Sequence, residues 1–305
     1  MKVIKAKVLG FCMGVRRAVD LAVEEARRSN GKPVYTFGPL IHNPKVLDDL
    51  YALGIQSIDE SLLSAPGFRL PAHGSLIIRA HGISPVLEKK LRGNGTHGEV
   101  SGSCRIVDAT CPKVKASQLK TSGLVKAGYF LFLAGEANHA EIEGLLGYAQ
   151  TERKNSSFSN CVIAGNAQEA RITAEKIYKE NKNIKTALLG QTTISEDEYK
   201  NIGEEIKKFF PNLKIINTIC AAASERRKAL LEIINQADAV IIAGGEESAN
   251  TRRLFAIAKE SGKPCVLAEN AAGIPEEFFA FETIGISAGA STPDSVIDEI
   301  ERKLK

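Results

Sequence analysis

The chain lacks several features that would place it in common functional classes. Its 305 residues contain no Trp, and aromatic residues make up 6% of the sequence, which leaves few side chains for stacking on nucleic-acid bases. The formal net charge of +4 is too small to predict a nucleic-acid partner, although it suits a small anionic ligand. No Walker A sequence and no C-x-x-C pair occur, which argues against a P-loop, a thioredoxin-type redox site and a zinc ribbon.

Long apolar runs are also absent. No stretch approaches the ~18 apolar residues of a membrane helix, and no apolar segment typical of a signal peptide follows the first lysines. We therefore expect a cytoplasmic protein with no membrane partner, whose six cysteines are reduced. Lys and Arg are spread along the predicted helices, where we expect solvated faces.

Three of the cysteines, Cys12, Cys111 and Cys220, each follow a short predicted strand and precede a predicted helix. The flanking segments are 3–9 and 15–28, then 106–107 and 112–126, then 213–216 and 221–236. Parallel α/β units bind ligands at the carboxyl ends of their strands, so three such ends around one point would gather three thiolates. Iron–sulfur ligation normally takes four cysteines, and three would leave one iron open to a substrate. A single such cysteine is most simply a buried apolar residue, but three in matching positions favour an iron–sulfur centre.

Two further sets of predicted strands repeat along the chain. Strands at 34–37, 129–134 and 239–243 end in glycine loops that carry His42, His139 and Asn250, and strands at 76–78, 187–189 and 283–287 precede His81, Thr192 and Ser291. Strands that alternate with helices predict parallel sheets. The sequence therefore predicts an α/β fold of three pseudo-repeated (βα)₃ modules, at 1–110 with Cys12, 111–219 with Cys111 and 220–305 with Cys220.

Periodicity supports helices at both ends of the chain. Apolar residues at helical spacing occupy 15–26 and 296–304, as in helices that pack on a sheet. We expect loops or short hairpins at 57–72 and 92–104. The second segment contains a G-x-G-x-x-G sequence at 93–98, but it follows a helix and precedes a strand, the reverse of the dinucleotide-binding context.

Polar residues gather at the predicted strand ends. His42, His81 and His139 lie there, and Thr192, Ser248, Asn250 and Ser291 come directly before helices. Helix N-termini bind phosphates, although plain N-capping explains any one Ser, Thr or Asn equally well.

Glu141 is an acid in a histidine-bearing loop, two residues after His139. It could relay protons to a reacting group, or it could be a first-turn acid favoured by the helix dipole. A three-thiolate metal cluster, an anion pocket and one acid together predict a redox reaction on a small phosphorylated molecule.

The residues around these positions resemble the 4-hydroxy-3-methylbut-2-enyl diphosphate reductase family over nearly the whole chain. The matching segments are Gly10-Phe11-Cys12-Met13-Gly14-Val15, Ile41-His42-Asn43, Ala80-His81-Gly82, Asp108-Ala109-Thr110-Cys111-Pro112, His139-Ala140-Glu141, Gln191-Thr192-Thr193, Thr218-Ile219-Cys220, Ser248-Ala249-Asn250 and Ala288-Gly289-Ala290-Ser291.

The resemblance implies a three-lobed cloverleaf around one [4Fe–4S] cluster. Cys12, Cys111 and Cys220 would bind three irons, and the fourth iron would take the allylic hydroxyl of the substrate. Glu141 would supply protons, with Thr192 near that hydroxyl. The residues that would hold the diphosphate are His42, His81, His139, Ser248, Asn250 and Ser291.

The implied reaction is the reductive dehydroxylation of (E)-4-hydroxy-3-methylbut-2-enyl diphosphate to isopentenyl and dimethylallyl diphosphate. It is the last step of the methylerythritol phosphate route to isoprenoids, with ferredoxin or flavodoxin as the electron donor. Two alternatives stay open from the sequence. One is a non-redox iron–sulfur hydro-lyase, and the other is a non-catalytic scaffold that binds a cluster or zinc.

The sequence departs from the family pattern at four places. Ala249 stands where a second Ser is usual, Ala140 where Pro is usual, Ala223 where Thr is usual and Arg227 where Gln is usual. The remaining cysteines, Cys104, Cys161 and Cys265, match no family ligand and are expected to be structural.

Overall fold

The computed structural model of the chain describes residues 1–59, 61, 73–92, 104–151 and 160–305. These residues form two compact units, Met1–Ile58 with Ala221–Lys305, and Asp59–Cys220. The predicted G-x-G-x-x-G segment and most of the two predicted loops lie outside the described residues.

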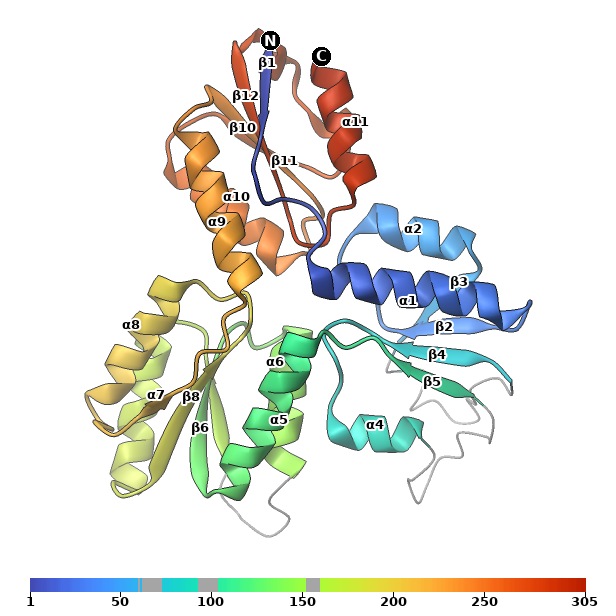
Figure 1. The fold of residues 1–305 in the computed structure, drawn as a ribbon. Helices are drawn as coiled ribbons and strands as arrows, with labels where there is room; N and C mark the ends of the chain where they lie inside the picture. The colour runs from blue at the N-terminus through green and yellow to red at the C-terminus, as the bar shows by residue number, and fades with distance from the viewer. Residues whose placement is uncertain (60, 62–72, 93–103, 152–159) are drawn as a thin grey trace. The chain divides into compact units, whose positions relative to one another are not determined.

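Strands and helices alternate along the chain (Figure 1). The strands are β1 (Lys2–Lys5), β2 (Val34–Phe37), β3 (Ile55–Ile58), β4 (Ser75–Ile78), β5 (Arg105–Asp108), β6 (Tyr129–Ala134), β7 (Cys161–Ala164), β8 (Lys185–Gly190), β9 (Lys214–Ile215), β10 (Ala239–Ala243), β11 (Cys265–Ala268) and β12 (Thr283–Ala288). The α-helices are α1 (Met13–Ser29), α2 (Pro44–Ala52), α4 (Pro85–Leu91), α5 (Pro112–Lys126), α6 (Ala140–Thr151), α7 (Ala167–Glu180), α8 (Glu196–Lys207), α9 (Ala221–Ile234), α10 (Ala249–Glu260) and α11 (Asp294–Leu304).

The strands make three four-stranded sheets with the orders β1-β12-β10-β11, β3-β2-β4-β5 and β7-β6-β8-β9. Every strand pair whose register is described is parallel. The predicted α/β fold with parallel sheets is thereby confirmed. Each sheet has four strands where three were predicted, because β3, β7 and β11 each add a short strand at a sheet edge.

One sheet of the first unit is built from both ends of the chain. Strand β1 pairs with β12, with Val3 opposite Ile284, and the two strands run side by side in Figure 1. The first strand therefore lies outside the sheet that contains β2, β3, β4 and β5, although residues 1–110 were predicted as one module.

Helices cover both faces of this sheet, which explains why β10 is apolar throughout. Ala239, Ile241 and Ala243 point to one face and share a core with the apolar side of α11. Val240 and Ile242 point to the other face and pack with α9 and α10. A strand buried on both faces reads as a continuous apolar run, and β10 is buried at every position.

The second unit contains a sheet of the same design. Leu131 and Leu133 of β6 share a core with residues of α5 and α6. Phe132 and Ala134 of the same strand face the residues of α7 and α8. The carboxyl end of β6 is therefore held from both sides, and the loop that follows it carries His139.

In each sheet, an edge strand in the corresponding position precedes the candidate ligand cysteine. Strands β1, β5 and β9 come before Cys12, Cys111 and Cys220, and each lies at a sheet edge. Their partners β12, β4 and β8 are the strands that precede Ser291, His81 and Thr192. Parallel pairing thus places each cysteine loop beside one candidate substrate loop, at the carboxyl edge of its own sheet.

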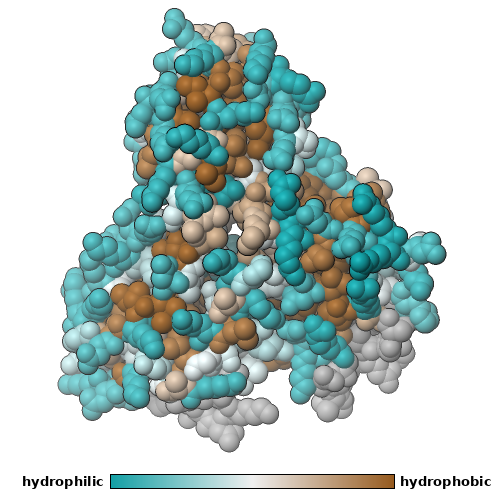
Figure 2. All heavy atoms as spheres, viewed as in Figure 1, coloured by the Kyte–Doolittle hydropathy of each residue, from teal (hydrophilic) through white to brown (hydrophobic). Residues whose placement is uncertain are grey.

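On the face shown in Figure 2, hydrophilic residues line the periphery and hydrophobic groups show between them. The large apolar side chains that are most exposed, such as Met13, Tyr51 and Leu119, belong to different helices. Single exposed apolar residues of this kind are normal on protein surfaces. Across the described residues, we find no helix with the length and hydrophobicity needed to span a bilayer.

Candidate active site

The three candidate ligand cysteines all stand at helix N-termini. Cys12 is the N-cap of α1, and its Sγ accepts a hydrogen bond from the Val15 N–H at 3.4 Å. Cys111 is the N-cap of α5, which opens with Pro112, and Cys220 directly precedes α9. All three are half-buried and form no disulfide bond. A helix N-terminus stabilises negative charge, and the thiolate is the form of cysteine that binds metals.

One hydrogen bond recurs at the three cysteines. The N–H of Cys12 donates to the Ala290 carbonyl at 3.1 Å, that of Cys111 to the Ala80 carbonyl at 2.9 Å, and that of Cys220 to the Thr192 carbonyl at 2.8 Å. Each bond joins a cysteine to the loop that carries Ser291, His81 or Thr192. Each cysteine backbone is therefore fixed to a candidate substrate loop.

The other three cysteines lie at the beginnings of strands and not at helix N-termini. Cys161 and Cys265 are the first residues of β7 and β11, and Cys104 directly precedes β5. Burial raises the pKa of the Cys104 thiol, and also that of Cys265 in spite of the nearby positive charge of Lys259. Cys104 lies at the opposite end of β5 from Cys111, so its closeness in sequence does not bring it to the same loop.

The donor set fits an iron–sulfur cluster in its chemistry. Iron–sulfur clusters take thiolates, and the three candidate thiols stand where helix dipoles favour an anion. Among the described residues, no three His, Cys, Asp or Glu side chains gather as a metal-binding group. Cys12 belongs to the first unit, whereas Cys111 and Cys220 belong to the second.

Glu141 and Thr192 are joined by two hydrogen bonds. The Thr192 N–H donates to Glu141 Oε1 and the Thr192 hydroxyl donates to Oε2, both at 2.8 Å. Glu141 is the second residue of α6 and is 1% exposed. A buried carboxylate needs such donors to be stable, so this acid is held in one orientation by the loop after β8.

His139 lies beside both Glu141 and His81. The Glu141 N–H donates to His139 Nδ1 at 3.2 Å, so this nitrogen acts as an acceptor. The rings of His139 and His81 meet edge to face, with centroids 5.3 Å apart.

These contacts make a continuous path within the second unit. It runs from Cys111 through the backbone of Ala80 to His81, then from His139 to Glu141 and from Thr192 to Cys220. The structure therefore links the candidate acid, two candidate phosphate ligands and two candidate metal ligands through successive contacts.

The first unit contains the other candidate diphosphate residues. The Ser291 hydroxyl donates to the His42 carbonyl at 3.0 Å, and Ser248 is the N-cap of α10, where its Oγ accepts from the Thr251 N–H at 3.4 Å. Capping uses an oxygen lone pair of Ser248 and leaves its hydrogen available to a ligand. Asn250 is 8% exposed, and its Nδ2 makes no hydrogen bond within the described residues, as expected of a donor whose partner is a ligand.

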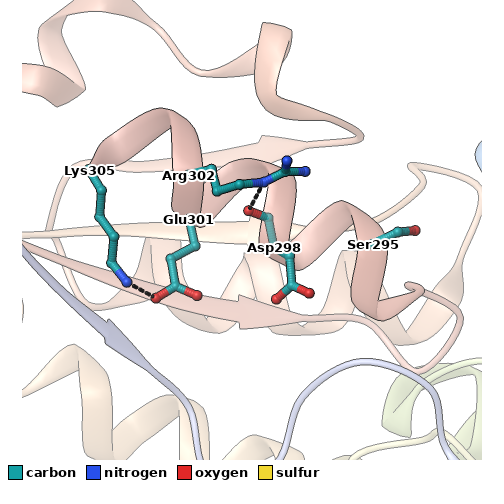
Figure 3. Close-up of a pocket in the computed structure, with 5 residues that line it drawn as sticks. All are labelled: Ser295, Asp298, Glu301, Arg302 and Lys305. Atoms are coloured by element: carbon teal, nitrogen blue, oxygen red, sulfur yellow. Dashed lines mark hydrogen bonds and ion pairs between the residues drawn. The ribbon is translucent and has the colours of Figure 1, made fainter.

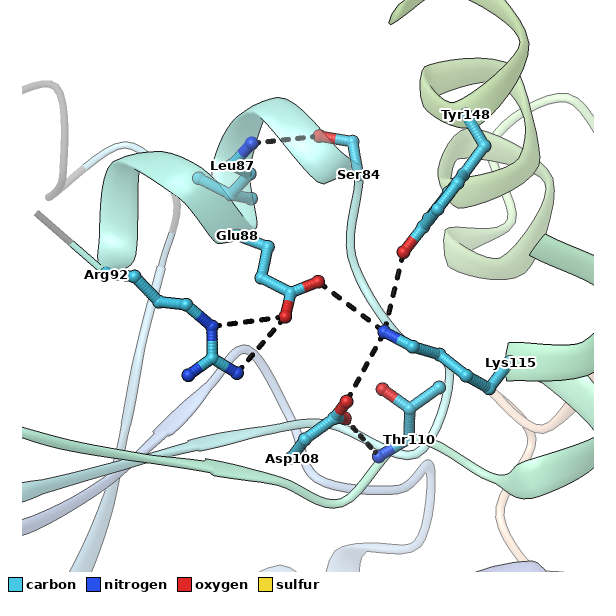
Figure 4. A network of polar contacts seen from close by, with 8 residues as sticks. All are labelled: Ser84, Leu87, Glu88, Arg92, Asp108, Thr110, Lys115 and Tyr148. Carbon is cyan, nitrogen blue, oxygen red and sulfur yellow. Dashed lines mark hydrogen bonds and ion pairs between the residues drawn. The ribbon is translucent and has the colours of Figure 1, made fainter. Parts of the chain in front are cut away.

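A polar network supports the loop before Cys111 (Figure 4). Asp108 Oδ1 accepts from the Thr110 N–H at 2.9 Å, and Asp108 Oδ2 lies 3.4 Å from Lys115 Nζ. Lys115 also lies 3.5 Å from a Glu88 carboxylate oxygen and 3.4 Å from the Tyr148 hydroxyl. Burial opposes ionisation of Asp108, but the Thr110 bonds and the Lys115 charge outweigh it and lower the pKa of this carboxyl.

The lowered pKa predicts a pH-dependent contribution of Asp108 to stability. Ionised Asp108 stabilises the fold above the unfolded pKa of about 3.9, and this contribution is lost as the pH falls through the folded pKa. Asp108→Asn keeps an acceptor for Thr110 but loses the ion pair. We expect the free energy of unfolding in urea to fall by about 1 kcal/mol at pH 7, with the difference from the parent chain vanishing at acid pH.

The matched control for this experiment is Asp20→Asn, an exposed position of α1. It should match the parent chain at every pH. A destabilisation by Asp108→Asn that is equal at pH 7 and in acid would contradict the role of charge.

A separate surface pocket lies along α11 and contains none of the predicted site residues (Figure 3). It is lined by Ser295, Asp298, Glu301, Arg302 and Lys305. Lys305 Nζ lies 2.6 Å from Glu301 Oε1, and Arg302 Nε donates to the Asp298 carbonyl at 3.3 Å. The pocket is thus a surface groove along one helix, lined mainly by charged side chains, and we assign no site to it.

Sequence reasoning missed two supporting residues, Lys115 and Arg226. Both were expected on solvated helix faces, but Arg226 is 2% exposed and Lys115 is half-buried in the network of Figure 4. The available signal for Arg226 was its place on the apolar stripe of α9, which continues through Ala229, Leu230 and Ile233.

Comparisons with known proteins were made against families, curated sequences and solved structures. The family model described as LytB protein matches residues 3–305. A 4-hydroxy-3-methylbut-2-enyl diphosphate reductase of Treponema denticola is 40% identical over 307 residues, covering 100% of this chain and 99% of the relative. The enzyme of that name from Aquifex aeolicus is 38% identical over 304 residues, covering 99% of this chain and 96% of the relative.

Solved structures agree with these sequence relatives. One structure of (E)-4-hydroxy-3-methylbut-2-enyl diphosphate reductase, described as the terminal enzyme of the non-mevalonate pathway, has a TM-score of 0.69 and 35% identity, covering 100% of this chain and 99% of that chain. The structure of an E-1-hydroxy-2-methyl-but-2-enyl-4-diphosphate reductase from Plasmodium falciparum has a TM-score of 0.81 and 26% identity, covering 99% of this chain and 87% of that one.

Proposed function

The chain belongs to the LytB protein family, and from that premise we propose that it reduces (E)-4-hydroxy-3-methylbut-2-enyl diphosphate to isopentenyl and dimethylallyl diphosphate. It is an oxidoreductase of isoprenoid biosynthesis, and its reaction is the last step of the methylerythritol phosphate pathway. The observation that carries the proposal is the full-length match to reductases of this name, at 40% identity for the Treponema denticola enzyme.

The cofactor is an iron–sulfur cluster, in keeping with the family. Within the proposal, Cys12, Cys111 and Cys220 hold a [4Fe–4S] cluster, and its fourth iron is open to the allylic hydroxyl of the substrate. When bound, the cluster supplies electrons and a Lewis acid for the departing oxygen. The helix N-termini behind these cysteines favour the negative charge of the three thiolates.

The reaction consumes two electrons and two protons, breaks the allylic C–O bond, forms a C–H bond and releases water. Glu141 is the proposed proton source, since its carboxyl group is buried and hydrogen-bonded to Thr192 through both oxygens. A protonated Glu141 can donate to Thr192 Oγ1, and the Thr192 hydroxyl can then donate to the substrate hydroxyl. This relay puts the proton on the leaving group without opening the site to water.

The diphosphate residues proposed from the sequence are His42, His81, His139, Ser248, Asn250 and Ser291. Asn250 Nδ2 and the Ser248 hydroxyl hydrogen are two donors that the described contacts leave for phosphate oxygens. Ala249 adds no hydroxyl where the family usually has Ser, and one neutral hydrogen bond contributes about 0.5–1.5 kcal/mol. Affinity for the diphosphate should therefore be about 2- to 10-fold lower than with Ser at this position.

The proposed reaction requires an external electron donor. A ferredoxin or flavodoxin would deliver the two electrons one at a time, in the cytoplasm, with no nucleic-acid or membrane partner.

The test is an assay of anaerobically purified protein. Iron, sulfide and the absorption spectrum are measured first, and the hydroxylated diphosphate is then supplied with reduced viologen as donor. We expect about four irons per chain and formation of both five-carbon diphosphates only when reductant is present.

Other outcomes would replace the proposal. Conversion of the substrate without any reductant would favour a hydro-lyase. Bound iron or zinc without affinity for the diphosphate would favour a non-catalytic scaffold.

A further inference from the structure

Arg226 of α9 is the largest side chain that the described part of the chain buries fully, at 2% exposure. Arg226 has no role in the proposed reaction. Removing a guanidinium from water is costly unless hydrogen bonds or charges compensate. The compensating partners of Arg226 therefore indicate why the chain keeps a charge at this position.

The described partners of Arg226 are two backbone carbonyls. Its Nη2 donates to the Gly10 carbonyl at 2.6 Å and its Nη1 donates to the Ala222 carbonyl at 3.0 Å. Gly10 stands two residues before Cys12, and Ala222 stands two residues after Cys220. One guanidinium thus joins the loop that leads into Cys12 to the first turn of the helix that follows Cys220.

The backbone at Gly10 is closely packed. Gly10 has φ of +74°, which favours glycine, and a Cβ there would lie 2.9 Å from Ile297 Cδ1. The same loop is anchored further on by the bond from the Cys12 N–H to the Ala290 carbonyl. Arg226 supplies the anchor on the amino side of Cys12.

We propose that Arg226 is a positioning residue that holds the Cys12 loop against the first turn of α9 and so retains the iron–sulfur cluster. The inference rests on the proposed function, because it takes Cys12 and Cys220 as cluster ligands. The planar guanidinium directs two N–H groups to two acceptors at fixed angles, which the single ammonium of Lys cannot do.

The experiment compares Arg226→Met and Arg226→Lys with the parent chain. The matched control is Lys228→Met, an exposed position two residues further along α9. Two quantities are measured: hydrogen exchange of residues 10–14 in the cluster-free chain, and the rate at which a chelator removes iron from the anaerobically loaded protein. With Met we expect both rates to rise about 10-fold or more, the effect of losing a hydrogen bond to a charged group.

Lys should give intermediate rates, and the control should match the parent chain. Rates within twofold of the parent in both Arg226 variants would overturn the inference, as would faster exchange spread over β10 and β12 rather than confined to residues 10–14. If Arg226→Met does not fold, Arg226→Lys decides by the same criteria. A parent chain that binds no cluster would refute the proposed function, while exchange in the cluster-free chain would still test the anchor.

Discussion

Replacing Glu141 with Gln is expected to lower turnover by about 10²- to 10⁴-fold, the usual contribution of a general acid. The amide has nearly the same shape but no acidic proton to give. Its NH₂ group also cannot accept from the Thr192 N–H or hydroxyl, both of which now donate to the carboxylate at 2.8 Å. The loss should fall on kcat, because the diphosphate is held by other residues.

The measurement is kcat and KM with reduced viologen, together with iron content and melting temperature. The matched control is Glu143→Gln, an exposed acid in the same first turn of α6, which should leave every quantity unchanged. Full activity in Glu141→Gln would remove Glu141 from the reaction. Loss of iron in that variant would instead assign it a structural role.

The sequence predicted the central strands better than the edge strands. Strands β2, β6 and β10 begin and end at the predicted residues, because strands buried on both faces read as apolar runs bounded by glycine. Strands β3, β7 and β11 are only four residues long. They pair on one side only and are partly exposed, so their sequences carry little of that signal.

The sequence indicated the strand ends as a candidate site, but it did not indicate which residues at these ends contact one another. Glu141 and Thr192 are separated by 51 positions along the chain, and they meet because β6 and β8 are neighbours in one sheet. Local pattern cannot specify such pairing. It did specify that residues after parallel strands share one edge, and for this reason the individual candidates were proposed.

Arg226 was predicted on a solvated helix face, but the structure buries it. A single charged residue on an apolar helical stripe conflicts with the rule that charges face water. Such conflicts between local pattern and burial often mark sites where a special contact compensates. Here the described hydrogen bonds go to two backbone carbonyls: that of Gly10, 216 positions away in the sequence, and that of Ala222, one turn earlier in the same helix.

Changing any one of Cys12, Cys111 and Cys220 to Ser is expected to have the largest effect of all. A hydroxyl is a far poorer iron ligand than a thiolate, and a cluster held by three cysteines has no spare protein ligand. We expect the iron content to fall from about four per chain toward zero. Turnover should fall by at least about 10³-fold, more than the loss of a general acid alone.

The controls are the same substitution at Cys104 and Cys265, which lie next to or in strands and away from helix N-termini. Burial raises the pKa of both thiols, which disfavours the thiolate that a metal requires. Both variants should keep iron and turnover, because a serine hydroxyl fills nearly the same space. Full iron in a variant of Cys12, Cys111 or Cys220 would exclude that residue as a ligand, and lost iron in Cys104→Ser at unchanged melting temperature would bring Cys104 into the set. The outcome therefore tests directly whether the repeated order of strand, cysteine and helix marks the cluster ligands, because the controls are cysteines outside that order.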